Sequence, residues 1–216
     1  MKNRFELIVF DWDGTLINTI DWIVHCLQKA GEECGLAKPE SQAAKDVIGL
    51  CIINAVATLF PGCDQETQKK IVANYSQAYS SKKLSPDDFF PGVYEMLVTL
   101  KESGYRLAVA TGKTRKGLTQ ALQATNTQDF FAVTRCADET ASKPDPKMLH
   151  EIITLTQASP DRTLMVGDSI HDMQMARNAN IPSIGVACGA NSKESLLQYD
   201  PLLCLQQPTE LLNIIT

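Results

Sequence analysis

The stretch Phe5–Ile20, which reads FELIVFDWDGTLINTI, organises the whole chain. It begins with the apolar run Leu7–Phe10, which is short and rich in strand-forming residues and therefore predicts a strand buried on both faces. Asp11 and Asp13 follow at once, and Gly14 marks a tight turn. Two carboxylates about 4 Å apart would repel each other by roughly 4 kcal/mol unless a cation or a proton lies between them. We therefore expect ligand chemistry at the carboxyl end of this strand, where open α/β sheets bind ligands.

Size and charge exclude several classes of protein. The chain has 216 residues, of which 44% are hydrophobic, enough for one sizeable core or for a core and a smaller helical unit. The net charge of -5 argues against general binding to nucleic acids or anionic membranes, because both require clustered lysine and arginine. The apolar run near the first residue is too short for a signal peptide, and no stretch approaches the ~20 apolar residues that span a bilayer. We expect a cytoplasmic protein.

Cysteine and histidine show no metal-binding or disulfide pattern. The 7 cysteines are scattered without a CxxC pair, and several lie within apolar patterns, which predicts buried free thiols. The 3 histidines are too dispersed in the sequence to suggest a cluster of metal ligands.

After the first strand, apolar residues follow helical spacing only. The expected helices cover residues 20–27, residues 48–60 and a third segment that Asp64 caps. Because no convincing strand occurs in residues 19–83, we expect a small helical subdomain inserted after the first strand. The segment Ser85–Gly92 is rich in proline, glycine and aspartate and is typical of a return linker. We therefore assign residues 17–87 to a helical cap, and residues 1–16 and 88–216 to the core.

The rest of the chain alternates between strands and helices. Strands are expected at residues 107–110, 132–134, 164–166 and 183–186, and helices at 93–100, 118–122, 149–153, 172–178 and 210–215. This βαβα order predicts a doubly wound, Rossmann-like parallel sheet. The expected fold class is therefore α/β, with an inserted α-helical cap subdomain.

Three further polar segments each follow an expected core strand. Thr111 and Gly112 place a hydroxyl and an unhindered backbone N–H at a strand tip, where they can bind phosphate oxygens or cap the next helix. Lys143 lies in a loop stiffened by prolines, where a lysine is usually solvated. Asp168 and Asp172 would point back towards the strand tips from the start of a helix. Their oxygens suit Mg²⁺, although aspartate is favoured at the start of any helix.

Taken together, these segments resemble a known family. DWDGTL, TGK, SKPDP and GDSIHD resemble, in order and in spacing, motifs I to IV of the haloacid dehalogenase (HAD) superfamily. The members of that superfamily are mostly Mg²⁺-dependent phosphatases that pass through an aspartyl phosphate. The long segment between the first two motifs, and the short gap between the last two, resemble the subgroup with a C1-type helical cap. That subgroup includes phosphoglycolate-phosphatase-like and β-phosphoglucomutase-like enzymes.

The resemblance implies a catalytic role for the first two carboxylates and a metal site around them. Asp11 would attack phosphorus to form an aspartyl phosphate, and Asp13 would protonate the leaving group and later activate water. Mg²⁺ would be bound by the side chains of Asp11 and Asp168 and by the backbone carbonyl of Asp13, with Asp172 close by.

The resemblance also implies groups that bind the substrate. Thr111, the backbone N–H of Gly112 and Lys143 would bind the phosphoryl oxygens, and the cap would close over the site to exclude water. The expected partner is a small phosphorylated metabolite, with neither nucleic acid nor membrane involved. Both a monomer and a homodimer remain open.

The same residues bear on other activities of this superfamily. A phosphomutase uses the same catalytic set and remains an alternative to a phosphatase. A dehalogenase needs no leaving-group acid, so Asp13 argues against it, and a phosphonatase would need a cap lysine in an apolar setting. A non-catalytic phosphate-binding module is disfavoured because no essential residue is missing. Lys113, Arg115 and Lys116 could bind a second anionic group, but we expect them to be solvated on the following helix.

Overall fold

The computed structural model describes residue 1 and residues 4–215, and its core is a parallel sheet. Six strands lie in the order β3-β2-β1-β4-β5-β6, and every neighbouring pair is parallel. The strands are β1 (Leu7–Phe10), β2 (Arg106–Thr111), β3 (Val133–Cys136), β4 (Thr163–Gly167), β5 (Ser183–Val186) and β6 (Leu203–Leu205). β1 lies between β2 and β4, so the strand that precedes the first two aspartates is central in the sheet.

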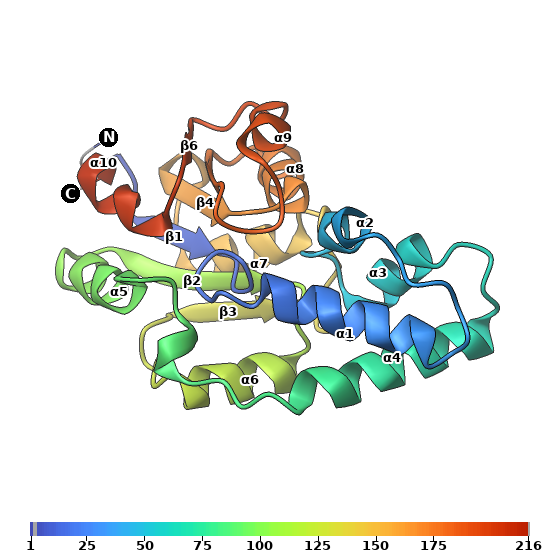
Figure 1. The fold of residues 1–216 in the computed structure, drawn as a ribbon. Coiled ribbons are helices and arrows are strands. Elements are labelled where there is room, and N and C mark those ends of the chain that lie inside the picture. Colours follow the sequence, from blue (N-terminus) through green and yellow to red (C-terminus); the bar gives the residue numbers. More distant parts are fainter. Residues whose placement is uncertain (2–3, 216) are drawn as a thin grey trace.

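Helices cover both faces of the sheet, as Figure 1 shows. Ile8 and Phe10 of β1 pack in one apolar cluster with residues of α5 (Val93–Glu102), α6 (Arg115–Ala124) and α10 (Leu212–Ile215). Leu7 and Val9 pack on the opposite face with α7 (Lys147–Thr156) and α8 (Ile170–Asn178). This alternation confirms that the apolar run is a strand buried on both faces and that the fold class is a doubly wound α/β sheet.

The segment between β1 and α5 forms a helical insert, defined here as α1–α4. Its helices are α1 (Ile20–Glu32), α2 (Ser41–Asp46), α3 (Ile52–Leu59) and α4 (Gln65–Ser80). They enclose apolar clusters of their own, and Figure 1 shows α1 and α4 side by side at a distance from most of the sheet. Asp64 caps α4 as expected, because its carboxylate accepts a hydrogen bond of 2.7 Å from the backbone N–H of Thr67.

The chain leaves and re-enters the core at one place. The backbone N–H of Asn18 donates to Asp88 O at 2.8 Å, and that of Phe90 donates to Leu16 O at 3.0 Å. A β-bridge between Ile17 and Phe89 lies between these two hydrogen bonds. The two connections therefore lie side by side, which gives the insert a narrow, hydrogen-bonded attachment to the core.

Several expected elements differ from the structure. The single helix expected at residues 48–60 is wrong, since Gly49 adopts a φ of +101° and the helix α3 begins only at Ile52. The expected C-terminal helix is divided into a 3₁₀ turn, Pro208–Leu211, and the short helix α10. Neither α9 (Lys193–Leu197) nor β6 was expected, because both are too short to show a clear period.

Two further expectations concern cysteines and membranes. All seven cysteines are free thiols, as expected from their spacing, but only Cys26 and Cys136 are buried, and the other five are partly exposed. Among the residues that the structure describes, no helix has the length and apolar character needed to cross a membrane.

Candidate active site

The site forms where three neighbouring strands end. Asp11 follows β1, Thr111 ends β2, and Asp168 follows β4, and because these strands are parallel and adjacent, all three residues lie at one edge of the sheet. The backbone N–H of Asp11 still donates to Val166 O of β4 at 3.0 Å, which fixes the first carboxylate against its neighbouring strand. All three side chains are buried.

Three carboxylates gather at this edge. Asp11, Asp168 and Asp172 each offer one oxygen, and these oxygens lie within 4.8 Å of one another. Burial is the main cause that raises the pKa of Asp11 well above its usual value, and the neighbouring carboxylates raise it further, whereas Lys143 lowers it. Burial, together with the charge of Asp172, also raises the pKa of Asp168, to about 7. The metal-free cluster is therefore electrostatically unfavourable when fully ionised.

One lysine compensates part of this charge. Lys143 Nζ lies 2.8 Å from Asp11 Oδ1 and 2.6 Å from Asp172 Oδ1, and its side chain is fully buried. Burial alone would lower the pKa of Lys143, but the two carboxylates outweigh it and raise the pKa above its usual value. Three ionised carboxylates and one ammonium would leave an excess of negative charge in a buried, oxygen-rich site. This donor set fits a hard divalent cation such as Mg²⁺.

Hydrogen bonds from the surrounding loops orient the second and third carboxylates. Thr15 Oγ1 donates to Asp168 Oδ1, and the backbone N–H of Ala190 donates to Asp168 Oδ2, both at 2.7 Å. Ser169 caps helix α8 and donates from both its N–H and its hydroxyl to Asp172 Oδ2, at 3.0 and 2.6 Å. This capping box leaves Asp172 Oδ1 facing Lys143.

The carboxylate of Asp13 lies outside the three-carboxylate cluster and is bound by other donors. Asp13 Oδ1 accepts from Thr19 Oγ1 at 2.7 Å and from the hydroxyl of Tyr79 at 3.2 Å. Lys113 Nζ lies 2.8 Å from Asp13 Oδ2 and donates to the Tyr79 hydroxyl at 2.7 Å. Burial, followed by the charge of Asp13, raises the pKa of Tyr79 well above its usual value, so its hydroxyl remains a neutral donor.

This arrangement corrects the expectation that Lys113 is solvated. Its side chain is only 8% exposed, because α6 begins at Arg115 and Lys113 lies in the turn before the helix rather than on its outer face. Tyr79 comes from α4 of the insert and Lys113 from the loop after β2. Insert and core therefore meet at Asp13.

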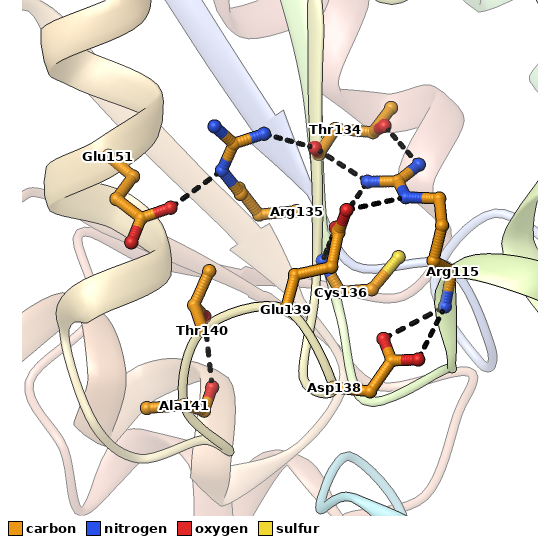
Figure 2. A network of polar contacts seen from close by, with 9 residues as sticks. All are labelled: Arg115, Thr134, Arg135, Cys136, Asp138, Glu139, Thr140, Ala141 and Glu151. Carbon is orange, nitrogen blue, oxygen red and sulfur yellow. Dashed lines mark hydrogen bonds and ion pairs between the residues drawn. The ribbon is translucent and has the colours of Figure 1, made fainter.

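The neighbouring Arg115 has a structural partner instead of a solvated guanidinium, as Figure 2 shows. Its Nε and Nη2 lie 2.9 and 2.5 Å from the two carboxylate oxygens of Glu139, and its backbone N–H donates to Asp138 at 2.9 Å. Glu139 also accepts from the backbone N–H of Cys136 at 3.1 Å. The pair raises the pKa of Arg115 and lowers that of Glu139. This network ties the start of α6 to the loop that leads to Lys143.

A cavity of about 1060 Å³ lies between the insert and the core. Asp11, Asp13, Thr111 and Gly112 line its core side, together with Lys113 and the exposed Lys116. These four residues of the first two motifs thus face a common space that is large enough for an organic ligand.

The loop between α2 and α3 of the insert touches the core directly above this site. A Cβ atom on Gly112 would lie 2.5 Å from Leu50 O and 2.6 Å from Gly49 O, so only a glycine fits there. The backbone N–H of Cys51 donates to Ser142 Oγ at 2.8 Å, one residue before Lys143. The insert therefore covers the ends of the strands in this structure.

Sequence reasoning found most, but not all, of the residues gathered here. The structure brings together the residues expected from the four motifs, namely Asp11, Asp13, Thr111, Gly112, Lys143, Asp168 and Asp172. Tyr79 and Thr19 were missed as partners of Asp13, and Thr15 was missed as a partner of Asp168. Thr15 lies inside the first motif and could have been suspected, whereas Tyr79 carries no local signal.

Comparisons with known proteins agree with this arrangement. Residues 8–186 match the family of haloacid dehalogenase-like hydrolases. The chain is 31% identical over 216 residues to pyrophosphatase PpaX of Halalkalibacterium halodurans, covering 98% of this chain and 97% of the relative. It is 31% identical to the probable phosphatase IndB of Dickeya dadantii, covering 96% of this chain and 92% of that one.

Solved structures show the same fold. A haloacid dehalogenase-like hydrolase of Bacteroides fragilis superposes with a TM-score of 0.87 at 24% identity, covering 96% of this chain and 99% of that one. The β-phosphoglucomutase of Clostridium difficile superposes with a TM-score of 0.83 at 17% identity, covering 96% and 93%. With its four motifs joined at one sheet edge and most of its length matched, the chain belongs to the haloacid dehalogenase-like hydrolase family.

Proposed function

We propose that this hydrolase is a Mg²⁺-dependent phosphatase that transfers the phosphoryl group of a small phosphorylated metabolite to Asp11 and then to water. The observation that carries the proposal is the buried cluster of Asp11, Asp168 and Asp172, compensated by Lys143 and adjacent to a cavity. The names of two relatives, a pyrophosphatase and a probable phosphatase, support the same reaction class.

Asp11 is the proposed nucleophile. It lines the cavity, and its position at the tip of the central strand holds the attacking oxygen still. The ammonium of Lys143, 2.8 Å from Asp11 Oδ1, lowers the pKa of this carboxyl and so opposes the larger effect of its burial. Mg²⁺ bound by Asp11, Asp168, Asp172 and the backbone carbonyl of Asp13 would neutralise charge on the phosphoryl oxygens.

Asp13 is the proposed general acid and base. Its carboxylate lines the same cavity, outside the metal cluster, so it faces the space in which the leaving group and later the water would exchange a proton with it. Lys113, Tyr79 and Thr19 hold it in place. In this role Asp13 gives a proton to the leaving group in the first half-reaction and takes one from water in the second.

The core loops supply the groups that bind the phosphoryl oxygens. The hydroxyl of Thr111 and the backbone N–H of Gly112 line the cavity at the tip of β2. Lys143 adds a positive charge from the opposite loop. Together they would bind the three oxygens of the transferred group, which lie around the axis between the attacking and the leaving oxygen.

We also propose that residues 17–87 form a cap that opens and closes on a core made of residues 1–16 and 88–216. The paired connections at Asn18 and Asp88 suit a hinge, because few backbone bonds would need to change there. Closure would exclude water from all but the productive position, so that the phosphoryl group transfers to Asp11 before water attacks it.

The reaction class is tested with a panel of phosphorylated metabolites in Mg²⁺, scored both for phosphate release and for isomerised sugar phosphate. We expect phosphate release that stops in EDTA. Isomer formation without release would replace the phosphatase with a phosphomutase, and full turnover in chelator would remove the metal from the mechanism.

The role of Asp13 has its own test. In Asp13→Asn, turnover of an alkyl phosphate should fall by the ~10² to 10⁴ typical of general acid and base catalysis. With p-nitrophenyl phosphate, whose leaving group needs little protonation, a burst of one nitrophenolate per enzyme should precede a slow steady state. Wild-type steady-state rates on the alkyl phosphate would show that Asp13 is not the acid and base.

A further inference from the structure

The cavity over Asp11 is larger than a small inorganic substrate requires. Its volume is about 1060 Å³, whereas sites of roughly 300–1,000 Å³ accommodate drug-sized organic ligands. Pyrophosphate, the substrate implied by the name of one relative, has only nine non-hydrogen atoms. It would leave most of this space to water.

One wall of the cavity is apolar and belongs to the insert. Ile23 and Leu27 of α1, Ile52 and Ala55 of α3, and Tyr75 of α4 all line it. The same five residues belong to one apolar cluster at the centre of the insert, and Figure 1 shows α1 and α4 side by side there. The cavity therefore extends from the carboxylates towards the apolar interior of the insert.

The chemistry of this wall selects what can bind against it. A phosphate or hydroxyl group placed there would lose hydrogen bonds to water and find none in return, which is unfavourable. A hydrocarbon or aromatic group would instead lose only its unfavourable contact with water. The wall thus suits the apolar part of an organic phosphate.

Positive charge is confined to other parts of the lining. Lys83 and Lys116 line the cavity and have no ion-pair partner among the residues that the structure describes. Lys82 also lines it but is paired with Asp88 at 2.7 Å. These two uncompensated lysines would attract the anionic end of an organic phosphate, and they leave the apolar wall itself free of charge.

We infer that the substrate is a phosphate monoester whose leaving group carries an apolar body, which packs against α1, α3 and α4 while the phosphoryl group faces Asp11. This inference rests on the proposed phosphatase function for the phosphoryl end only. The apolar wall determines the rest of the molecule, and a second phosphate in place of the apolar body is the rival that the experiment separates.

The test is a binding series with n-alkylphosphonates from methyl to hexyl, which cannot be hydrolysed, titrated by calorimetry in Mg²⁺. Each added methylene should lower Kd by about 3- to 4-fold while it is buried against the apolar wall. Equal Kd values for the methyl and hexyl compounds, with pyrophosphate bound more tightly than either, would overturn the inference.

A matched pair of variants locates the apolar site. Ile52→Ala removes part of the wall and should reduce the ratio of methyl to hexyl Kd values by about tenfold. The adjacent Ile53 is 66% exposed and does not line the cavity, so Ile53→Ala should leave the ratio unchanged. Because the readout is a ratio within one protein, a loss of active protein does not change it. An unchanged ratio in Ile52→Ala would contradict the assignment.

Phosphate release from the matching n-alkyl phosphates separates this inference from the proposed function. Chain-length-dependent binding without release would refute the phosphatase and leave the apolar site in place. Release at one kcat/KM for every chain length would support the phosphatase and refute the apolar site.

Discussion

Replacing Gly112 with alanine perturbs the contact between insert and core without touching a charged group. The added Cβ would lie 2.5 Å from Leu50 O and 2.6 Å from Gly49 O, whereas ordinary contact begins near 3.4 Å. Both neighbours are backbone atoms and cannot rotate away. Because the nearest atoms all belong to the loop between α2 and α3, we expect this loop to move outward by roughly 1 Å in Gly112→Ala.

Such a displacement should reduce activity far more than stability. A misplacement of about 1 Å at a catalytic site can cost ~10² in rate, so we expect kcat/KM for p-nitrophenyl phosphate to fall about 100-fold. A second readout is hydrogen exchange at the amide of Cys51, which donates to Ser142 Oγ at 2.8 Å and should exchange faster in the variant. Gly117→Ala, in helix α6 beside the same cavity, is the matched control and should keep both properties.

Two outcomes would refute this reasoning. Wild-type kcat/KM in Gly112→Ala, with the amide of Cys51 still protected, would show that the loop tolerates the methyl group or that its contact with the core is irrelevant to turnover. A loss of activity accompanied by a large fall in Tm would show that the variant acts through folding instead.

Further predictions concern the partners of Asp13 and the metal site. Lys113→Met removes an ion pair of 2.8 Å to Asp13 and should lower kcat at least tenfold on an alkyl phosphate. Tyr79→Phe removes the hydroxyl that donates to Asp13 at 3.2 Å and accepts from Lys113 at 2.7 Å, but it leaves the ion pair in place and should cost less; equal losses would contradict the geometry. Mg²⁺ at 100 times its Kd should raise the free energy of unfolding by about 2.7 kcal/mol and Tm by roughly 5–11 °C. Because the folded-state pKa of Asp168 is about 7, above its ordinary 3.8, ionising this carboxyl destabilises the metal-free protein as the pH rises from about 4 through 7. The increase in Tm should therefore be larger at pH 8 than at pH 5, and an increase independent of pH would argue against metal binding at this cluster.

The core and the gathering of the motif residues could be predicted because both depend on short-range patterns. A buried parallel strand requires an unbroken apolar run such as Leu7–Phe10, and parallel topology then places Asp11, Thr111 and Asp168 at one edge whatever the connecting segments do. The cap of α4 was predictable for the same reason, since Asp64 acts on a backbone N–H only three residues away.

The contacts between insert and core could not be predicted in this way. Tyr79 reaches Asp13 across 66 residues, and Lys113 reaches it across 100, so neither contact leaves a periodic signal in the sequence. The left-handed conformation of Gly49 likewise depends on where the insert meets Ser169 and Gly112, which only the tertiary structure determines. Lys113 was expected to be solvated because, in the sequence, it belongs only to a short cluster of positive charges with Arg115 and Lys116.

The most direct test of the central claim is to trap the phosphoenzyme. Borohydride reduces an aspartyl phosphate to homoserine, so enzyme quenched during turnover with Mg²⁺ and then reduced should carry homoserine at position 11, as peptide mass spectrometry would show. Asp13, Asp168 and Asp172 are internal controls and should remain aspartate. Homoserine at another of these positions would contradict the assignment of Asp11 as the nucleophile. Its absence from all four positions, in an enzyme that accumulates its intermediate and still releases phosphate, would contradict the assignment as well.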